Sequence, residues 1–178
     1  MRSYSQRRAA AVISLAAIVA AAALMVLFVY NATPAPLPLG ERMPLFHTIT
    51  IGGEAFVQDT LDGKRSLLVF FNPGCSHCRR ELENLDELQP RYADKLDIIG
   101  MSLDSLGATQ TMTAELKLKF PVVVADDQQL KKTPKINILP ALFFVDKFQI
   151  LRKYYAGEHS LAVDKRLIED FIFPANTP

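Results

Sequence analysis

The sequence predicts an α/β sandwich, in which a mixed central sheet is flanked by helices, with a transmembrane helix at the N-terminus. Three observations predict it. A continuous apolar run at residues 66–71 and mostly apolar segments at residues 96–103 and 141–146 are typical of strands in the interior of a sheet. Segments with helical periodicity alternate with these runs, which is the order found in layered α/β domains. Residues 9–30 carry no charged side chain and suit a membrane span.

The N-terminal segment is expected to anchor the chain in a membrane. A helix over residues 9–30 would extend roughly 33 Å, which covers the hydrocarbon core of a bilayer. Three arginines among residues 1–8 have no acidic neighbour and favour a cytoplasmic N-terminus. A cleaved signal peptide is the alternative, but its apolar region would be shorter, roughly 7–15 residues. We therefore expect a single-pass protein of a bacterial inner (cytoplasmic) membrane, with its C-terminal domain in the periplasm or outside the membrane.

The composition excludes two other classes of protein. The chain has 20 basic and 19 acidic residues, and its small basic surplus belongs to the N-terminus alone, so no nucleic acid partner is expected. It has two cysteines, fewer than a small secreted protein held together by disulfides would need. The cysteines lie three positions apart, which indicates a local chemical role.

A proline-rich segment separates the anchor from the folded domain. Residues 31–43 include three prolines and a glycine, a composition typical of a stiff, extended tether. The domain itself is then expected over residues 44–178.

The domain begins with a hairpin and two buried strands. Residues 46–57, with two glycines near the centre, predict a β-hairpin or two short strands. After the strand over residues 66–71, apolar positions at helical spacing predict a helix over residues 75–92. That helix leads to the strand over residues 96–103.

The second half of the domain continues the alternation and ends in a hairpin and a helix. The elements expected there are a helix over residues 109–119, a strand over 120–125, a short helix over 127–133, strands over 141–146 and 150–155, and a helix over 161–172. The last helix is amphipathic, so we expect it to close the domain against the sheet.

Cys75 and Cys78 lie where a buried strand gives way to a helix. The first backbone N–H groups of a helix have no partner within it, and the positive end of its dipole lies there. Both favour the thiolate form of Cys75, which is the nucleophile in disulfide exchange. Cys78 lies one turn further along, close enough to attack a mixed disulfide formed at Cys75. We therefore predict an attacking and a resolving thiol.

Structural interpretations of this cysteine pair are weaker. Half of a zinc site would require further ligands, but His47, His77 and His159 stand at no motif spacing. A purely structural disulfide would close a loop so short that it restrains the unfolded chain by only about 2 kcal/mol. Accidental spacing does not account for the position at a strand-to-helix junction. The C-x-x-C pair therefore indicates redox chemistry, and no metal or cofactor is predicted.

Residues 44–172 resemble the thioredoxin superfamily, most closely its membrane-tethered TlpA-like branch. Three features carry the resemblance: the apolar strand followed by Cys75-Ser76-His77-Cys78, the segment Ile138-Leu139-Pro140 before a strand, and the anchor with its proline-rich tether. The resemblance implies a thioredoxin-like sandwich and thiol–disulfide exchange with extracytoplasmic protein thiols or disulfides, without a cofactor. A membrane dithiol protein would donate or accept the electrons.

Pro140 stands where this family keeps a cis-proline that faces the dithiol. An X–Pro bond adopts the cis form at a cost of only about 0.5–1 kcal/mol, and the backbone of Leu139 would then face the sulfurs. A substrate chain can pair with such a backbone as an added strand. An ordinary proline at the start of a strand is the alternative, and the resemblance favours the cis form.

Glu81 is expected to share a helix face with Cys78, Leu82 and Leu85, where a carboxylate is costly unless it has a role. Some TlpA-like proteins have a glutamate at this position that exchanges protons with the resolving cysteine. The resemblance implies the same role for Glu81, with a raised pKa. A carboxylate at the edge of the face, reaching solvent, is an equal alternative.

Ser76 and His77, between the cysteines, are expected to set the redox potential. A histidine before the second cysteine is similar to the strongly oxidising DsbA-type proteins, because its ring can stabilise the thiolate of Cys75. TlpA-like proteins usually act as reductants. The two resemblances point in opposite directions, so the direction of electron flow stays open.

Three departures from general thioredoxins favour a narrower client, such as an apocytochrome or a maturing enzyme. The chain has Gly74 where thioredoxins usually have Trp, Val69 where they have a buried acidic residue, and Ala141 where Thr commonly follows the cis-proline. The F-F-x-P-x-C turn is similar to that of methylamine-utilisation accessory thioredoxins.

Two alternative functions are less well supported by the sequence. A copper-binding assembly factor would pair the cysteines with a distant histidine, and His159 lies in a suitable loop, but the close C-x-x-C and Pro140 oppose it. A peroxiredoxin-like peroxidase needs Thr or Ser three residues before its reactive cysteine, and Asn72 stands there.

Overall fold

The computed structural model describes residues 16–25, 37–44, 46–57, 61, 63–125 and 136–174 of the 178-residue chain. The chain falls into two units, divided between Ala35 and Pro36, and each is described by itself. In the first unit, residues 16–25 are helical. Among the described residues, no helix is both long and apolar enough to cross a membrane. The rest of the expected anchor at residues 9–30 and the helix expected at residues 127–133 lie outside the described residues.

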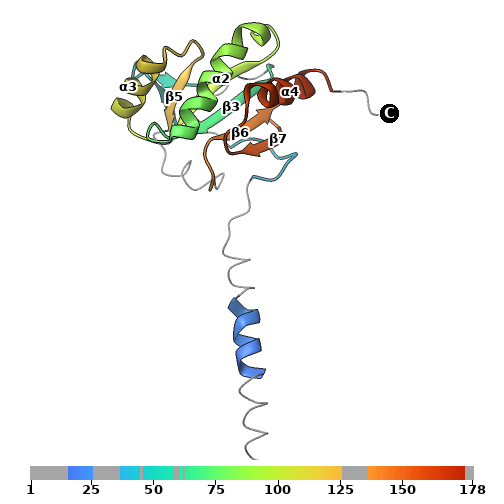
Figure 1. Ribbon diagram of the computed structural model, residues 1–178. Helices are drawn as coiled ribbons and strands as arrows, with labels where there is room; N and C mark the ends of the chain where they lie inside the picture. The colour runs from blue at the N-terminus through green and yellow to red at the C-terminus, as the bar shows by residue number, and fades with distance from the viewer. Residues whose placement is uncertain are drawn as a thin grey trace, which may run out of the picture. The chain divides into compact units, whose positions relative to one another are not determined.

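The described residues of the second unit form a seven-stranded sheet with the order β2-β1-β5-β4-β3-β6-β7 (Figure 1). Its strands are β1 (Thr48–Thr50), β2 (Ala55–Phe56), β3 (Ser66–Phe71), β4 (Asp97–Ser102), β5 (Val122–Ala125), β6 (Ala141–Val145) and β7 (Leu151–Ala156). β3 lies in the interior, parallel to β4 and antiparallel to β6. The sheet is therefore mixed, as predicted, and β1 and β2 form the predicted hairpin.

The helices α2 (Ser76–Tyr92), α3 (Leu106–Leu116) and α4 (Leu161–Ile172) pack on one face of this sheet. Successive side chains of a strand point to opposite faces, so β3 contributes to two apolar clusters. Leu67, Val69 and Phe71 join the cluster under the helices, and Leu68 and Phe70 join the cluster on the other face. All five are at most 1% exposed, which fixes the end of β3 in a packed core.

α3 has different bounds from the predicted helix over residues 109–119. It begins at Leu106, because the Oγ of Ser105 accepts a hydrogen bond from an N–H of the first turn (3.4 Å) and caps the helix. It ends at Leu116, because Lys117 adopts a left-handed conformation with φ of 53°.

The folded domain also begins earlier than predicted. The N–H of Gly40 donates to the carbonyl of Leu151 (2.8 Å), and the N–H of Leu151 donates to the carbonyl of Glu41 (2.9 Å). The sequence places residues 40–43 in the extended tether, but backbone pairing joins them to the start of β7. The boundary of the domain therefore lies near residue 40 rather than residue 44.

Candidate active site

The side chain of Asn72 holds the turn between β3 and α2. Its Oδ1 accepts a hydrogen bond from the N–H of Gly74 (2.8 Å), and its Nδ2 donates to Oδ2 of Asp104, which follows β4 (3.1 Å). The carbonyl of Asn72 accepts from the N–H of Cys75 (3.0 Å). These bonds fix Cys75 at the N-cap of α2, at the predicted junction. Asn72 stands where a peroxiredoxin-like peroxidase would have the Thr or Ser that binds peroxide. Its side chain is already engaged in the hydrogen bonds with Gly74 and Asp104.

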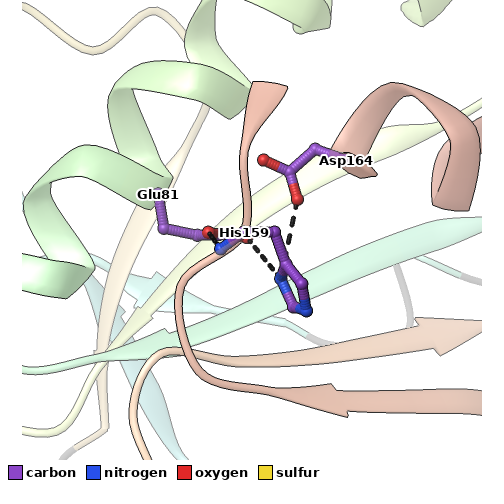
Figure 2. Close-up of side chains that lie close together, drawn as sticks. All are labelled: Glu81, His159 and Asp164. Carbon is purple, nitrogen blue, oxygen red and sulfur yellow. Dashed lines mark hydrogen bonds and ion pairs between the residues drawn. The ribbon is translucent and has the colours of Figure 1, made fainter. Parts of the chain in front are cut away.

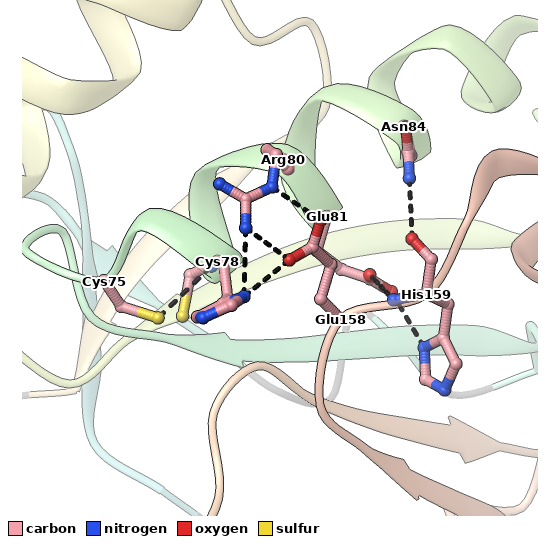
Figure 3. Close-up of polar contacts among 8 residues, drawn as sticks. Cys75, Cys78, Arg80, Glu81, Asn84, Glu158 and His159 are labelled. Carbon is pink, nitrogen blue, oxygen red and sulfur yellow. Dashed lines mark hydrogen bonds and ion pairs between the residues drawn. The ribbon is translucent and has the colours of Figure 1, made fainter.

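The two sulfur atoms differ in exposure. The N–H of Cys78 donates to Sγ of Cys75 over 3.2 Å, so the sulfur itself caps the helix (Figure 3). Cys75 is half-buried, Cys78 is fully buried, and neither forms a disulfide. Burial, followed by the hydrogen bond with Cys75, raises the pKa of Cys78 to about 12. The arrangement suits an accessible attacking sulfur and a sheltered resolving thiol.

His77 lies in a network of charged side chains on the exposed side of α2. Its Nδ1 is 2.6 Å from Oε2 of Glu158, in the segment between β7 and α4. Arg80 donates two hydrogen bonds to the same carboxylate, from Nε to Oε1 and from Nη2 to Oε2, both of 2.6 Å (Figure 3). Nη2 of Arg80 also lies 3.0 Å from Nδ1 of His77. The hydrogen bonds from Arg80 and His77 lower the pKa of Glu158 to about 2.

Glu81 is fully buried in a cluster with His159 and Asp164 (Figure 2). The N–H of His159 donates to Oε2 of Glu81 (2.7 Å), and Nδ1 of His159 lies 3.4 Å from Oε1 of Glu81. The same Nδ1 lies 3.7 Å from Oδ1 of Asp164. Nδ2 of Asn84 donates to Oδ2 of Asp164 (3.3 Å) and to the carbonyl of His159 (3.1 Å). The alternative in which Glu81 reaches solvent is therefore wrong.

The two buried carboxyl groups of this cluster oppose each other's ionisation. Burial raises the pKa of Glu81, and hydrogen bonds from the N–H of His159 and from Asp164 partly offset the rise. Burial, and then the charge of Glu81, raise the pKa of Asp164 to about 7. Each carboxyl group therefore makes it harder for the other to lose its proton. The direction of the Glu81 shift is the predicted one.

The same cluster could hold a metal ion. Glu81, His159 and Asp164 each offer one ligand atom, and these atoms lie within 4.8 Å of one another. Two carboxylates and an imidazole suit a divalent cation such as zinc. The copper alternative instead requires His159 to join the two sulfurs, whereas its ring lies against the carboxylates.

The other predicted site residues lie around the start of α2. The bond between Leu139 and Pro140 is cis, as the resemblance implies. Leu139 lines a pocket together with His77 and Glu158, so the structure brings the segment before β6 to the dithiol motif. Ser76 is the first residue of α2 and is exposed.

Among the charged residues of the site, three lie outside the sequence prediction: Arg80, Glu158 and Asp164. Asp164 had a detectable signal, because it stands on the buried face of α4 with Ile168, as Glu81 does on α2. Arg80 and Glu158 had no signal in the sequence, because both are exposed charged residues and they lie 78 positions apart.

The chain matches the AhpC/TSA family over residues 39–154. It is 28% identical over 126 residues to the thiol-disulfide oxidoreductase ResA of Bacillus thuringiensis (strain Al Hakam), covering 70% of this chain and 73% of that protein. It is 25% identical over 122 residues to the thioredoxin-like protein YneN of Bacillus subtilis (strain 168), covering 66% of this chain and 71% of that protein.

Solved structures share the fold. The thioredoxin domain of a thiol-disulfide oxidoreductase from Bacteroides vulgatus matches with a TM-score of 0.67 and 23% identity, over 76% of this chain and 99% of that chain. StoA from Bacillus subtilis matches with a TM-score of 0.61 and 21% identity, over 72% of this chain and 100% of that chain. The predicted thioredoxin-like sandwich is confirmed.

Proposed function

Because the chain belongs to the AhpC/TSA family and is a thiol–disulfide oxidoreductase, we propose that it exchanges disulfides with extracytoplasmic proteins through Cys75 and Cys78. The observation that carries the proposal is the 3.2 Å hydrogen bond from the N–H of Cys78 to Sγ of Cys75. It places a half-buried sulfur, which a client can reach, within one helical turn of a buried sulfur that resolves the product.

The exchange conserves electrons in two steps. In the reducing direction, the Cys75 thiolate attacks a client disulfide, one client sulfur leaves, and a mixed disulfide joins the two proteins. Cys78 then loses its proton, attacks the sulfur of Cys75 and expels the second client sulfur. The client gains two electrons, its two leaving thiolates take up protons from water, and Cys75 and Cys78 become a disulfide. Oxidation of a client runs through the same steps in reverse.

The second step needs a proton acceptor, because the pKa of Cys78 is about 12 in the dithiol. Glu81 lies one turn further along the same buried face of α2, and burial raises its pKa. In this proposal Glu81 takes up the proton of Cys78 during reduction of a client and returns it when the disulfide is reduced. The raised pKa of Asp164, due to burial and to the charge of Glu81, disfavours a pair that carries two negative charges.

Leu139 and Pro140 are proposed to receive the client. Leu139 lines a pocket with His77 and with Ile138, which is 57% exposed. An apolar rim beside His77, which stands between the cysteines, suits an extended client segment, whose backbone would pair with that of Leu139. An apocytochrome or a maturing enzyme is a client of this kind.

The proposed location is the outer face of a bacterial cytoplasmic membrane. Residues 9–30 would span the membrane, and the arginines before them would remain in the cytoplasm. A disulfide exchanger outside the cytoplasm needs a source or sink of electrons. A membrane dithiol protein would fill that role by exchanging with Cys75 and Cys78.

Trapping of a mixed disulfide tests the exchange. In Cys78→Ser, Cys75 still attacks a disulfide but no resolving thiol remains, so a covalent adduct with a disulfide-bonded peptide should accumulate. Cys75→Ser should form no such adduct. Mass spectrometry without reductant measures both. An adduct in Cys75→Ser but not in Cys78→Ser, or an adduct in neither variant, would overturn the proposal.

A further inference from the structure

The network of His77, Arg80 and Glu158 lies at the dithiol, and no step of the exchange uses it. It joins the exposed side of α2 to the segment before α4, across 78 and 81 positions of sequence. Three of its contacts are 2.6 Å long and the fourth is 3.0 Å. Because His77 stands between the two cysteines and Arg80 lies two residues after the second, the charges of this network lie near the sulfurs.

Positive charge near Cys75 would stabilise its thiolate, and that favours the dithiol over the disulfide. Two groups can supply the charge. His77 stands between the cysteines, and the guanidinium of Arg80 lies close enough to Cys75 for the two charges to interact. Without a counter-ion, either group would make the cysteine pair more oxidising.

We propose that Glu158 is a positioning residue that holds His77 and Arg80, offsets the positive charge near Cys75, and thereby makes the cysteine pair more reducing. This inference rests on the proposed exchange function and adds its direction. The pair passes two electrons to a client disulfide. A membrane dithiol then returns two electrons by reducing the disulfide between Cys75 and Cys78.

The geometry makes Glu158 more effective than an ordinary surface carboxylate. Exposed ion pairs usually contribute little, because water screens them and long side chains lose freedom. Here Arg80 binds both carboxylate oxygens, an arrangement that fixes the orientation of the two groups, and His77 contacts one of the same oxygens. With a pKa near 2, the Glu158 carboxylate keeps its charge at every pH at which thiols react.

A redox titration of the full chain in glutathione buffers tests the proposal by comparing Glu158→Gln with a matched variant, Glu115→Gln. Glu115 pairs over 2.8 Å with Arg79, the neighbour of Arg80 on α2. We expect Glu158→Gln to shift the equilibrium constant about tenfold toward the dithiol, which is ~30 mV for a two-electron couple. Glu115→Gln should leave the potential unchanged.

A double-mutant cycle tests whether the shift passes through the network. Glu158→Gln is combined with His77→Asn and, separately, with Arg80→Gln. The shift in redox potential caused by Glu158→Gln should be smaller in a protein that already lacks His77 or Arg80. If Glu158→Gln has the same redox potential as the parent protein, or if Glu115→Gln shifts the potential by an equal amount, the inference is wrong. The proposed exchange function would still hold. If the cysteine pair fails to equilibrate with glutathione in every variant, both the exchange function and this inference are wrong.

Discussion

The backbone N–H of His159 donates to Oε2 of Glu81 over 2.7 Å, between residues 78 positions apart. This bond joins the segment before α4 to the buried face of α2. The preceding residue, Glu158, joins the same segment to Arg80 on the exposed side of α2. One short segment, residues 158–159, therefore contacts both the buried Glu81 and the exposed Arg80 of α2. Substitutions at either contact should therefore affect the disulfide exchange at Cys75 and Cys78.

Glu81→Gln should slow the resolving step. The amide keeps the size of the side chain but cannot accept the proton of Cys78, and general-base catalysis commonly contributes at least about a hundredfold. We expect a roughly hundredfold lower rate of disulfide reduction near pH 7, measured by rapid mixing with a fluorescent disulfide peptide. Glu87→Gln changes an exposed carboxylate of the same helix and serves as the control. Equal rates in the two variants would leave Glu81 with a structural role only.

Asp164 should make the stability of the fold depend on pH. Its pKa is about 7 in the folded protein, against 3.8 ordinarily, so the folded state retains a proton that the unfolded state has already lost. The stabilisation is complete below about pH 4 and is lost as the pH rises through about 7, by up to about 4 kcal/mol. Asp164→Asn removes this titration. Its free energy of unfolding in urea should therefore vary less between about pH 4 and about pH 8 than that of the parent protein, and an unchanged pH dependence would contradict the assignment.

The two cysteines should react with iodoacetamide at very different rates. Alkylation requires an accessible thiolate, and Cys78 has a pKa of about 12 and no exposed surface. Near pH 7 we expect one adduct, on Cys75, with Cys78 slower by a factor on the order of a hundred or more. Peptide mass spectrometry measures both, and protein unfolded in urea, in which both should react, is the control. Rapid labelling of Cys78 in the folded protein would show that it does not lie in the core.

Gly100→Ala should destabilise the sheet beside the active-site turn. A Cβ at this position of β4 would lie 3.1 Å from Cγ2 of Val122 and 3.2 Å from the ring of Phe71. Overpacking of this kind typically costs about 1–3 kcal/mol. Gly107→Ala on α3 is the matched control, because none of the described atoms lies within 4 Å of its added Cβ. It should raise stability by up to about 1 kcal/mol, and equal thermal midpoints for the two variants would contradict the packing argument.

The elements with the strongest patterns could be predicted from the sequence. β3 and α4 have the predicted bounds, because a continuous apolar run and a regular amphipathic period leave little choice of structure. α3 could not be placed so well. Its sequence, LGATQTMTAEL, has weak periodicity, and the side chain of Ser105 decides where it begins.

From the residues alone, the site could be predicted only where its members are neighbours in sequence, and the family resemblance supplied Leu139 and Pro140. Cys75, Cys78 and Glu81 lie within two turns of one helix, so spacing alone brings them together. Glu158 and Asp164 reach the site only because α4 and the segment before it pack beside α2, and no local pattern encodes that packing. The position of Asp164 on an apolar helix face still marks it as a buried acid that needs a partner.

The pairing of residues 40–43 with the start of β7 should also hinder association of the molecule with its own copies. β7 is the last strand of the sheet, and a bare strand edge is a template on which another molecule can add a strand and begin to aggregate. The chain's own backbone occupies the first part of this edge, and Arg152 and Lys153 add positive charge beyond it. A protein shortened past residue 43 would lose this cover and should aggregate through β7.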